Sequence, residues 1–233
     1  MNKVKKIWYR IKQIPFIGVP YEKYIGSKRR KKLFKKKSMI VRQYGIEGIN
    51  MVENVLGRVV QVYFADSGTL LGTIRDHKII EWDPDVDYGI VIERDFDWMV
   101  LQKAMEASGF KKIREWSLNN NITEQTYQIG KLTIDIFGHF IEGDRLVSYG
   151  YQQFPGKKYQ EGYFDTYQFT CPMIKGTKKE KLGPISVNVP INAEEFLSYI
   201  YDENWMIPNP DWVIFSGRGF KLLSGQQGHI KEF

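Results

Sequence analysis

Asp83, Asp85 and Asp87 stand at alternate positions, directly before an apolar run that ends at Ile92. The pattern predicts a strand from Asp85 to Ile92, and because side chains alternate along a strand, Asp85 and Asp87 share one face. Pro84 leaves the direction of Asp83 open. Two neighbouring carboxylates repel each other unless a cation lies between them, and an all-oxygen site favours Mg²⁺ or Mn²⁺. The pair therefore indicates metal-dependent phosphate chemistry, and the alternative is a solvated acidic loop.

Asp135 lies in a second apolar run, from Leu132 to Phe137, in which Ile134 and Ile136 point to the opposite face. An acid within such a strand is costly unless it is paired or bound to a metal. We expect Asp135 to be the third ligand of the same metal, or a general base beside it. A strand residue held in a salt bridge is the alternative.

A glycine turn precedes the aspartates and follows a β-rich run. Backbone N–H groups of a turn that opens a helix can bind a phosphate. The candidate residues for binding a phosphorylated donor are Ser67, Gly68, Thr69 and Gly72, together with Arg75, whose planar guanidinium suits a diphosphate. The order strand, turn, helix, strand brings this turn and the aspartates to one end of a sheet. A plain strand-to-helix connection is the alternative.

The elements expected to position these residues follow from periodicity and turn residues. Helices are expected up to Gly57, from Phe96 to a stop at Gly109, and after a capping box at Asn192 and Glu195. Strands are expected at 59–64, 85–92, 126–129 and 132–137, and residues 143–190 are expected to form loops and short strands. This order predicts an α+β fold, a mixed β-sheet with flanking helices.

The net charge of +7 over 233 residues is unevenly distributed. Residues 1–42 hold fifteen Lys or Arg and one acid, so the remainder carries a net charge of −7. We therefore divide the chain into a basic amphipathic arm, 1–43, and a catalytic domain with a loop-rich C-terminal part, 44–233. Cations mixed with large apolar residues suit an anionic membrane surface. Nucleic-acid binding and a solvated extension are the alternatives for the arm.

Several function classes are excluded or weakened by composition. No apolar run reaches the roughly 18 residues of a membrane span, and the basic segment before Pro15 lacks the apolar core of a signal peptide. One cysteine, Cys171, and three histidines are a poor supply for structural zinc. A surface or core position accounts for His77 and His139 better than a catalytic role does. We expect a cytoplasmic protein, peripheral at the inner face of the membrane.

Five elements in this order resemble the LicD and fukutin family. They are the turn 68–72, Arg75, the aspartates 83–87, the strand 132–137 and a C-terminal block over 187–208. The likeness covers roughly residues 45–215. It implies a nucleotidyltransferase-like fold and transfer of phosphocholine or a polyol phosphate from a CDP-activated donor to a hydroxyl of a cell-surface or lipid-linked glycan. Asp76, Lys78 and Glu81 depart from residues frequent in the family, which bears on donor or acceptor specificity.

On this interpretation Asp85 and Asp87 hold Mg²⁺ on the donor diphosphate, and Asp135 completes the site or takes a proton. A nucleotidyltransferase that moves NMP to a small molecule, protein or RNA is the first alternative. A non-enzymatic, basic nucleic-acid-binding protein is the second. The negative charge of residues 43–233 argues against the second, and we expect no nucleic-acid partner.

Overall fold

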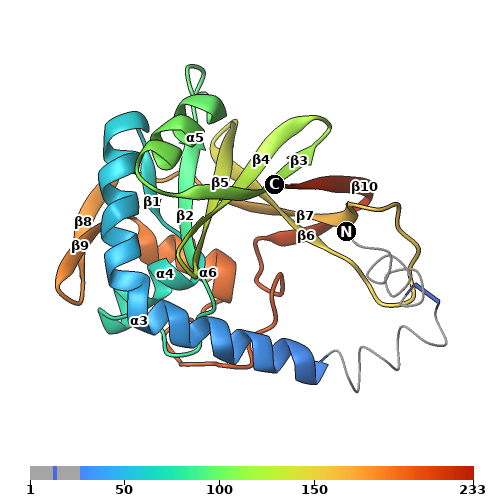
Figure 1. The fold of residues 1–233 in the computed structure, drawn as a ribbon, viewed down its shortest axis with the longest axis horizontal. Helices are drawn as coiled ribbons and strands as arrows, with labels where there is room; N and C mark the ends of the chain where they lie inside the picture. Colours follow the sequence, from blue (N-terminus) through green and yellow to red (C-terminus); the bar gives the residue numbers. More distant parts are fainter. Residues whose placement is uncertain (1–12, 15–26) are drawn as a thin grey trace.

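The computed structural model describes residues 13–14 and 27–233. Its helices are α3 (Ser27–Val59), α4 (Ser67–Leu71), the π-helix η2 (Gly72–Asp76), α5 (Trp98–Ala107) and α6 (Ala193–Tyr201). Its strands are β1 (Tyr63–Ala65), β2 (Val86–Ile92), β3 (Lys111–Leu118), β4 (Asn121–Ile129), β5 (Leu132–Glu142), β6 (Arg145–Gln152), β7 (Tyr163–Pro172), β8 (Thr177–Leu182), β9 (Ile185–Pro190) and β10 (Phe220–Glu232). The arrangement is α+β, as the sequence predicts (Figure 1).

Eight strands form one mixed sheet in the order β1-β2-β5-β4-β3-β10-β7-β6, and β8 pairs with β9 in a separate hairpin. The long strand β5 pairs with β4 through its first half and with β6 through its last residues. Strands β5, β4, β3, β10, β7 and β6 therefore follow one another around a closed ring of pairings. Among the strands in the described residues, only β2 and β5 run parallel, and all other pairs are antiparallel.

Helix α3 is longer than the sequence predicts and contacts α5, β2, β5 and β9. Its Lys- and Arg-rich first half has good helix formers and no Gly or Pro until Gly45, so the helix continues through the basic run. It therefore crosses the boundary between residues 43 and 44, and the division into arm and domain stays a prediction. The rest of the arm, residues 1–12 and 15–26, lies outside the described residues.

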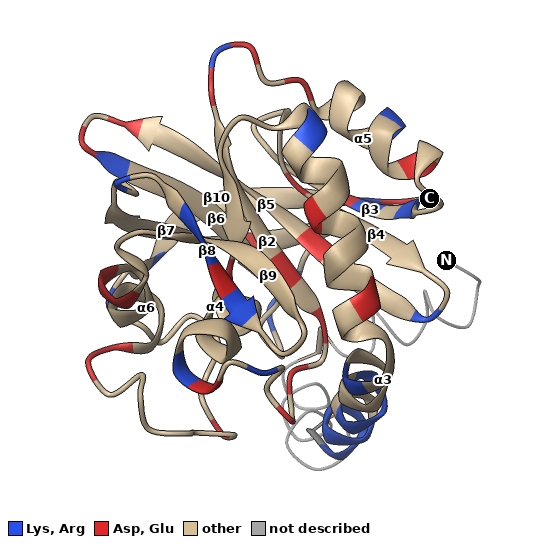
Figure 2. Ribbon diagram, turned by 90° about the vertical axis from the view of Figure 1, so that its left-hand side faces the viewer, with Lys and Arg blue, Asp and Glu red and all other residues tan. Residues whose placement is uncertain are grey.

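The central expectations for the sheet are confirmed. Strands β4 and β5 meet at a tight turn in which Gly130 has a φ of 56°, a conformation that glycine adopts without strain. Strand β2 begins at Val86, so Asp85 lies one residue before it. Figure 2 shows β2 between α3 on one side and α4 and α6 on the other. The core contains Phe64, Tyr88 and other buried apolar side chains from these elements.

Other expectations were wrong in detail. The strand expected at 59–64 starts at Tyr63, because Val59 still belongs to α3. The sequence predicts that α5 turns Phe96, Met99, Val100, Ala104 and Ala107 to the core, but Met99 and Val100 are half exposed while Leu101 and Met105 are buried. Residues 143–190 form four strands rather than mainly loops, and β3 and β10 were not expected at all.

The capping box expected at the start of α6 is also wrong. The helix does begin after Asn192, but the side chain of Asn192 caps no backbone N–H of the helix. Its Oδ1 instead accepts a hydrogen bond from the backbone N of Lys175, and its Nδ2 donates to Glu195 and to the carbonyl of Met173. The side chain therefore ties α6 to the segment after β7.

Candidate active site

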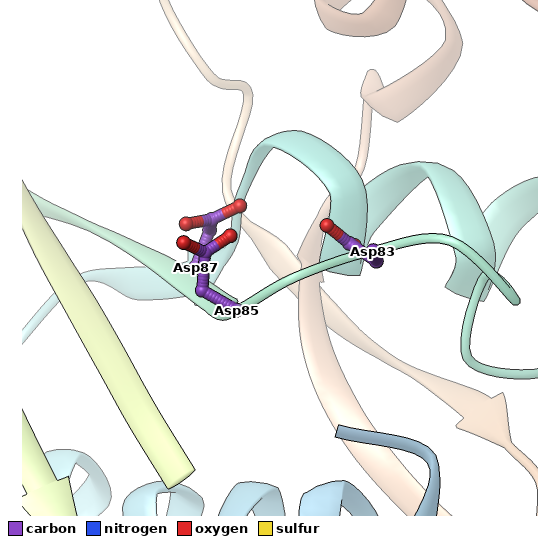
Figure 3. A group of neighbouring side chains, drawn as sticks. All are labelled: Asp83, Asp85 and Asp87. Atoms are coloured by element: carbon purple, nitrogen blue, oxygen red, sulfur yellow. The ribbon is translucent and has the colours of Figure 1, made fainter. Parts of the chain in front are cut away.

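The three aspartates gather at the start of β2. Carboxylate oxygens of Asp83, Asp85 and Asp87 lie within 4.8 Å of one another. Figure 3 shows Asp85 and Asp87 projecting together and the carboxylate of Asp83 turned toward them from the preceding loop. The geometry thus places Asp83, whose direction Pro84 left open, with the other two. All three offer only oxygen ligands, which is the donor set that Mg²⁺ and Mn²⁺ prefer.

Asp135 stands beside this group because β5 runs parallel to β2. The two strands pair Asp87 directly with Asp135, so both side chains share one face of the sheet. Asp135 is buried, and its Oδ1 accepts no hydrogen bond from the described residues. Its nearest cation is the guanidinium of Arg114, with Nη2 at 3.7 Å from Oδ1. A buried carboxylate oxygen without a donor is the feature that a bound cation would explain.

Asp83, Asp85 and Asp87 hold their protons more tightly than ordinary carboxyl groups do. Burial, and then the charge of Asp85, raises the pKa of Asp83. Burial and the neighbouring carboxylates likewise raise the pKa of Asp87. Burial and the charge of Asp135 raise the pKa of Asp85 to about 6, although Lys37 and Arg114 oppose the shift. The common cause is negative charge collected out of water, which a divalent cation would offset.

The glycine turn packs directly on the aspartates. Asp66 precedes the five-residue helix α4 and accepts a hydrogen bond from the backbone N of Ser67 at 2.6 Å. A Cβ at Gly68 would collide with the carboxylate of Asp83, so this position must remain glycine for the aspartate to approach. The hydroxyl of Thr69 accepts a hydrogen bond from the backbone N of Asp87 at 3.0 Å. Ser67 to Thr69 therefore help to set the geometry of the aspartates.

The other two residues expected to contact a donor have partners within the chain. A Cβ at Gly72 would lie 2.6 Å from the carbonyl oxygen of Lys78, so this glycine serves a close backbone approach. The guanidinium of Arg75 makes two hydrogen bonds to Asp76, at 3.1 and 2.8 Å, and is almost fully buried. Asp76 is one of the departures from the family pattern, and here it neutralises the motif arginine.

Four residues near the aspartates were missed by sequence reasoning. The Nζ of Lys37, on α3, lies 3.5 Å from Asp85 Oδ2, although Lys37 belongs to the run assigned to the arm. Arg114 and the buried Glu124 come from strands β3 and β4, and burial and then Asp135 raise the pKa of Glu124. Tyr201 ends α6, and burial and then Asp83 and Asp87 raise the pKa of its phenol.

Arg114 could have been found only with the strand register in hand. Direct cross-strand pairs link Asp87 to Asp135, Asp135 to Thr126, and Thr126 to Arg114. Paired residues point to the same face, so these four side chains form one row across β2, β5, β4 and β3. The last residue of the row is Arg114, whose guanidinium lies 3.7 Å from Asp135.

His139 supports the glycine turn through Asp66 and does not lie among the three aspartates. It is buried, and its Nε2 lies 2.7 Å from Asp66 Oδ2, while the other oxygen of Asp66 holds the backbone of Ser67. The ring also contacts Phe64 and Phe196. His77 lies on the surface at the end of η2. Neither histidine contacts Asp83, Asp85 or Asp87, in agreement with the core and surface positions expected for them.

Comparison with known proteins places these residues in a family context. Residues 61–192 match the family described as LicD/FKTN/FKRP, nucleotidyltransferase domain. An uncharacterized protein of Rickettsia typhi is 29% identical over 166 residues, which are 69% of this chain and 45% of that protein. Ribitol-5-phosphate transferase FKTN of Mus musculus is 27% identical over 177 residues, 75% of this chain and 36% of that protein.

The chain thus spans less than half the length of these curated relatives. Among solved structures, that of ANT(2″)-Ia in complex with adenylyl-2″-tobramycin matches with a TM-score of 0.38 and 14% identity, covering 73% of this chain and 81% of that one. The match to the family contains the glycine turn, the three aspartates and Asp135.

Proposed function

The chain belongs to the LicD/FKTN/FKRP nucleotidyltransferase domain family, and from this premise we propose that it transfers a phospho-alcohol, phosphocholine or a polyol phosphate, from a CDP-activated donor to a glycan hydroxyl. The observation that carries the proposal is the group Asp83, Asp85 and Asp87 set beside Asp135 on paired parallel strands. A relative named as a ribitol-5-phosphate transferase supports the phospho-alcohol.

Asp85 and Asp87, with Asp135 or Asp83, are the residues that would hold Mg²⁺ or Mn²⁺. The fit rests on the all-carboxylate donor set, the Oδ1 of Asp135 that accepts no hydrogen bond from the described residues, and the raised pKa values of Asp83, Asp85 and Asp87. When bound, the metal would neutralise charge on the donor diphosphate and on the leaving nucleotide.

The turn and the nearby cations would bind the donor. Gly68 lies against the carboxylate of Asp83, whereas the backbone N–H of Ser67 donates to Asp66. Lys37 and Arg114 bring positive charge to the aspartates from two sides. Both cations could pair with phosphate oxygens once a metal relieves their carboxylate partners. Arg75 joins the donor-binding set only if a phosphate replaces Asp76 as its partner.

The transfer step forms one bond and breaks one. The acceptor oxygen attacks the phosphorus that carries the alcohol, and the bond from this phosphorus to the bridging oxygen of CDP breaks. CMP leaves with that oxygen and its electron pair. Where Asp83 completes the metal site, the hydroxyl proton passes to the Asp135 carboxylate, which lies beside Asp87 in the register and is then the general base. Its Oδ1 is free of hydrogen bonds from the described residues.

A CMP-release assay with a panel of CDP-alcohols tests the donor class. It is run with and without Mg²⁺, with the acceptor glycans added in a second series, and with Asp85→Asn as the control. We expect metal-dependent release from one donor and none from the variant. No release from any donor in the presence of acceptors would overturn the proposal.

Nucleotidyl transfer to a small molecule, protein or RNA is the second candidate, because the matching family is described as a nucleotidyltransferase domain. The same aspartates would serve it. The products separate the two reactions, since phospho-alcohol transfer releases CMP, whereas nucleotidyl transfer leaves NMP on the acceptor. Mass measurement of the modified acceptor decides between them.

We also propose that residues 1–43 bind an anionic membrane surface. None of the helices in the described part of the chain combines the length and apolar character that a membrane span requires. Of the arm, the structure describes residues 13–14 and the first turns of α3. Their many lysines and arginines are the support for this partner, and a nucleic acid is not expected.

A further inference from the structure

The segment between α6 and β10, residues 202–219, presents apolar side chains to solvent. Met206, Ile207, Val213 and Ile214 are 56, 66, 65 and 59% exposed. Folded proteins expose single apolar residues commonly, but four large ones on one short segment mark an interaction surface. We call this segment the apolar loop.

The apolar loop is anchored at its base rather than free along its length. Trp212 packs on Tyr201 with ring centroids 4.7 Å apart. Phe215 stacks on Tyr167 at 4.6 Å, and Asp202 accepts a hydrogen bond from the backbone N of Arg218. The exposed side chains therefore occupy a defined surface.

A second surface is the first part of α3. All side chains from Lys28 to Lys36 are exposed, so the helix projects from the body on every side over this stretch. The cations are interrupted by two large apolar residues, Leu33 and Phe34, which are 52 and 48% exposed. Figure 2 shows the Lys and Arg gathered at this end of α3. We call residues 28–36 the basic helix end.

Both surfaces lie at the same side of the molecule. In Figures 1 and 2, which differ by a rotation about the vertical axis, the basic helix end and the apolar loop both lie at the bottom. Side chains connect both surfaces to the neighbourhood of the aspartates. Lys37, which follows the basic helix end, lies 3.5 Å from Asp85, and Trp212 of the apolar loop packs on Tyr201. Burial and then the charges of Asp83 and Asp87 raise the pKa of the Tyr201 phenol.

The chemistry of the two surfaces fits an anionic lipid bilayer. Lysines and arginines attract anionic headgroups, while aliphatic side chains gain by entering the acyl region. A nucleic acid would use the cations but offers no partner for Met206, Ile207, Val213 and Ile214, because bases stack on aromatic rings. The apolar loop also carries three acids and one cation: Glu203 lies 3.8 Å from Arg218, Asp202 accepts from the backbone N of Arg218, and Asp211 adds a further negative charge. Its contribution to docking is therefore the insertion of apolar side chains, and the positive charge comes from the basic helix end.

We propose that the basic helix end and the apolar loop dock together on a phospholipid bilayer containing anionic lipid. Docking holds the aspartates at the bilayer surface. The acceptor is then a lipid-linked glycan at that surface, and this last statement rests on the proposed function.

Single-cysteine labelling of the full chain tests the docking. The native Cys171 is buried, and burial raises the pKa of its thiol, so it stays unlabelled. Leu33→Cys and Ile214→Cys report the two surfaces with an environment-sensitive fluorophore. Ile141→Cys is the matched control, because Ile141 is 48% exposed and lies at the end of β5. Each is mixed with vesicles of equal parts phosphatidylcholine and phosphatidylglycerol, or of phosphatidylcholine alone.

We expect a blue shift at positions 33 and 214 with the mixed vesicles, no shift at 141, and none with phosphatidylcholine alone. Replacing Ile207 and Ile214 by Ser should lower the vesicle partition coefficient about tenfold. Replacing Lys31, Lys32, Lys35 and Lys36 by Glu should abolish binding. An unchanged emission at 214, an equal shift at 141, or binding to a nucleic-acid duplex in place of vesicles would overturn the proposal.

The docking and the chemistry can fail separately. Release of CMP is measured with a soluble donor and soluble acceptor glycans, without a bilayer, and none of these substitutions touches the aspartates or Lys37. Release without docking would remove only the docking. Docking without release from any donor would remove only the proposed reaction.

Discussion

Buried carboxylates lie on both sides of β2, but their hydrogen-bond partners differ. On the α3 side, Glu53 accepts hydrogen bonds from the hydroxyls of Tyr63 and Tyr88, the backbone N of Asn188 and the Nζ of Lys179. On the other side, the aspartates face one another, and Asp135 Oδ1 has no donor among the described residues.

This difference distinguishes a carboxylate that stabilises the fold from carboxylates that form the candidate site. Glu53 is one charge with one cation and three further donors, so it joins α3, β1, β2 and the β8–β9 hairpin. The aspartates are a surplus of negative charge that Lys37 and Arg114 offset only partly. A fully satisfied buried charge stabilises the fold, whereas an unsatisfied group persists where it binds something.

The largest expected effect is on turnover in Asp87→Asn. Removing a ligand charge should lower kcat/KM for the CDP-alcohol by about a thousandfold or more, because the metal loses a central carboxylate. The metal-free variant should be at least as stable as the native chain, since one repulsive charge is gone. Steady-state CMP release and thermal unfolding measure the two quantities, and a large loss of stability would contradict the contrast.

Glu53→Gln should show the reverse pattern. Loss of the charge weakens the bonds to Lys179 and the two tyrosines, and we expect the free energy of unfolding to fall by about 2–4 kcal/mol. Turnover at a temperature where the variant is folded should stay within a few-fold of the native value. Urea unfolding gives the stability, and a neutral effect would show that Glu53 is not a structural centre.

Binding of Mg²⁺ should depend on pH, because burial and neighbouring carboxylates raise the pKa of Asp85 to about 6 and also raise the pKa values of Asp83 and Asp87. Protons compete with the metal, so affinity should rise as the pH rises through these pKa values. The raised pKa of Asp85 also means that the metal-free fold is most stable below the unfolded pKa and loses stability as the pH rises through about 6. Calorimetric titration between pH 5 and 8 measures the affinity, and a flat profile would disprove the coupling.

Lys37→Met should have the smallest effect and sharpen the same measurement. Lys37 lowers the pKa of Asp85 by its charge and its hydrogen bond, so its removal should move the midpoint for Mg²⁺ binding to higher pH. The control is Lys103→Met, an exposed lysine on α5. An unchanged midpoint in Lys37→Met would mean that the contact with Asp85 is not formed in solution.

The sequence predicts that Asp85, Asp87 and Asp135 lie close together because its signals are local, and their role as metal ligands stays a prediction. Strand geometry alone puts Asp85 and Asp87 on one face and makes the isolated acid at Asp135 visible. The glycine turn before them is also visible in a short stretch of sequence. What the sequence cannot supply is register. Arg114 lies beside Asp135 because both pair with Thr126 of β4, and no spacing in the chain reveals this register. Glu124 comes close to the aspartates for the same reason, because it also lies on β4.

The remaining errors also have physical causes. Lys37 was assigned to a surface arm because a run of cations has no apolar periodicity, yet the helix carries it back to the body. Strand β10 has a register shift between Leu223 and Gln227 and two glycines near it, so its alternation is broken. In α5, tertiary packing selects Leu101 and Met105 over the neighbouring Met99 and Val100.

The most direct test of the central claim is a thermal-unfolding measurement with added Mg²⁺, because it needs neither donor nor acceptor. A ligand that binds only the folded state raises the unfolding temperature by mass action. We predict a rise for the native chain and for Glu53→Gln, and none for Asp87→Asn. An equal rise in Asp87→Asn, or no rise in the native chain at pH 8, would contradict a metal site at these aspartates.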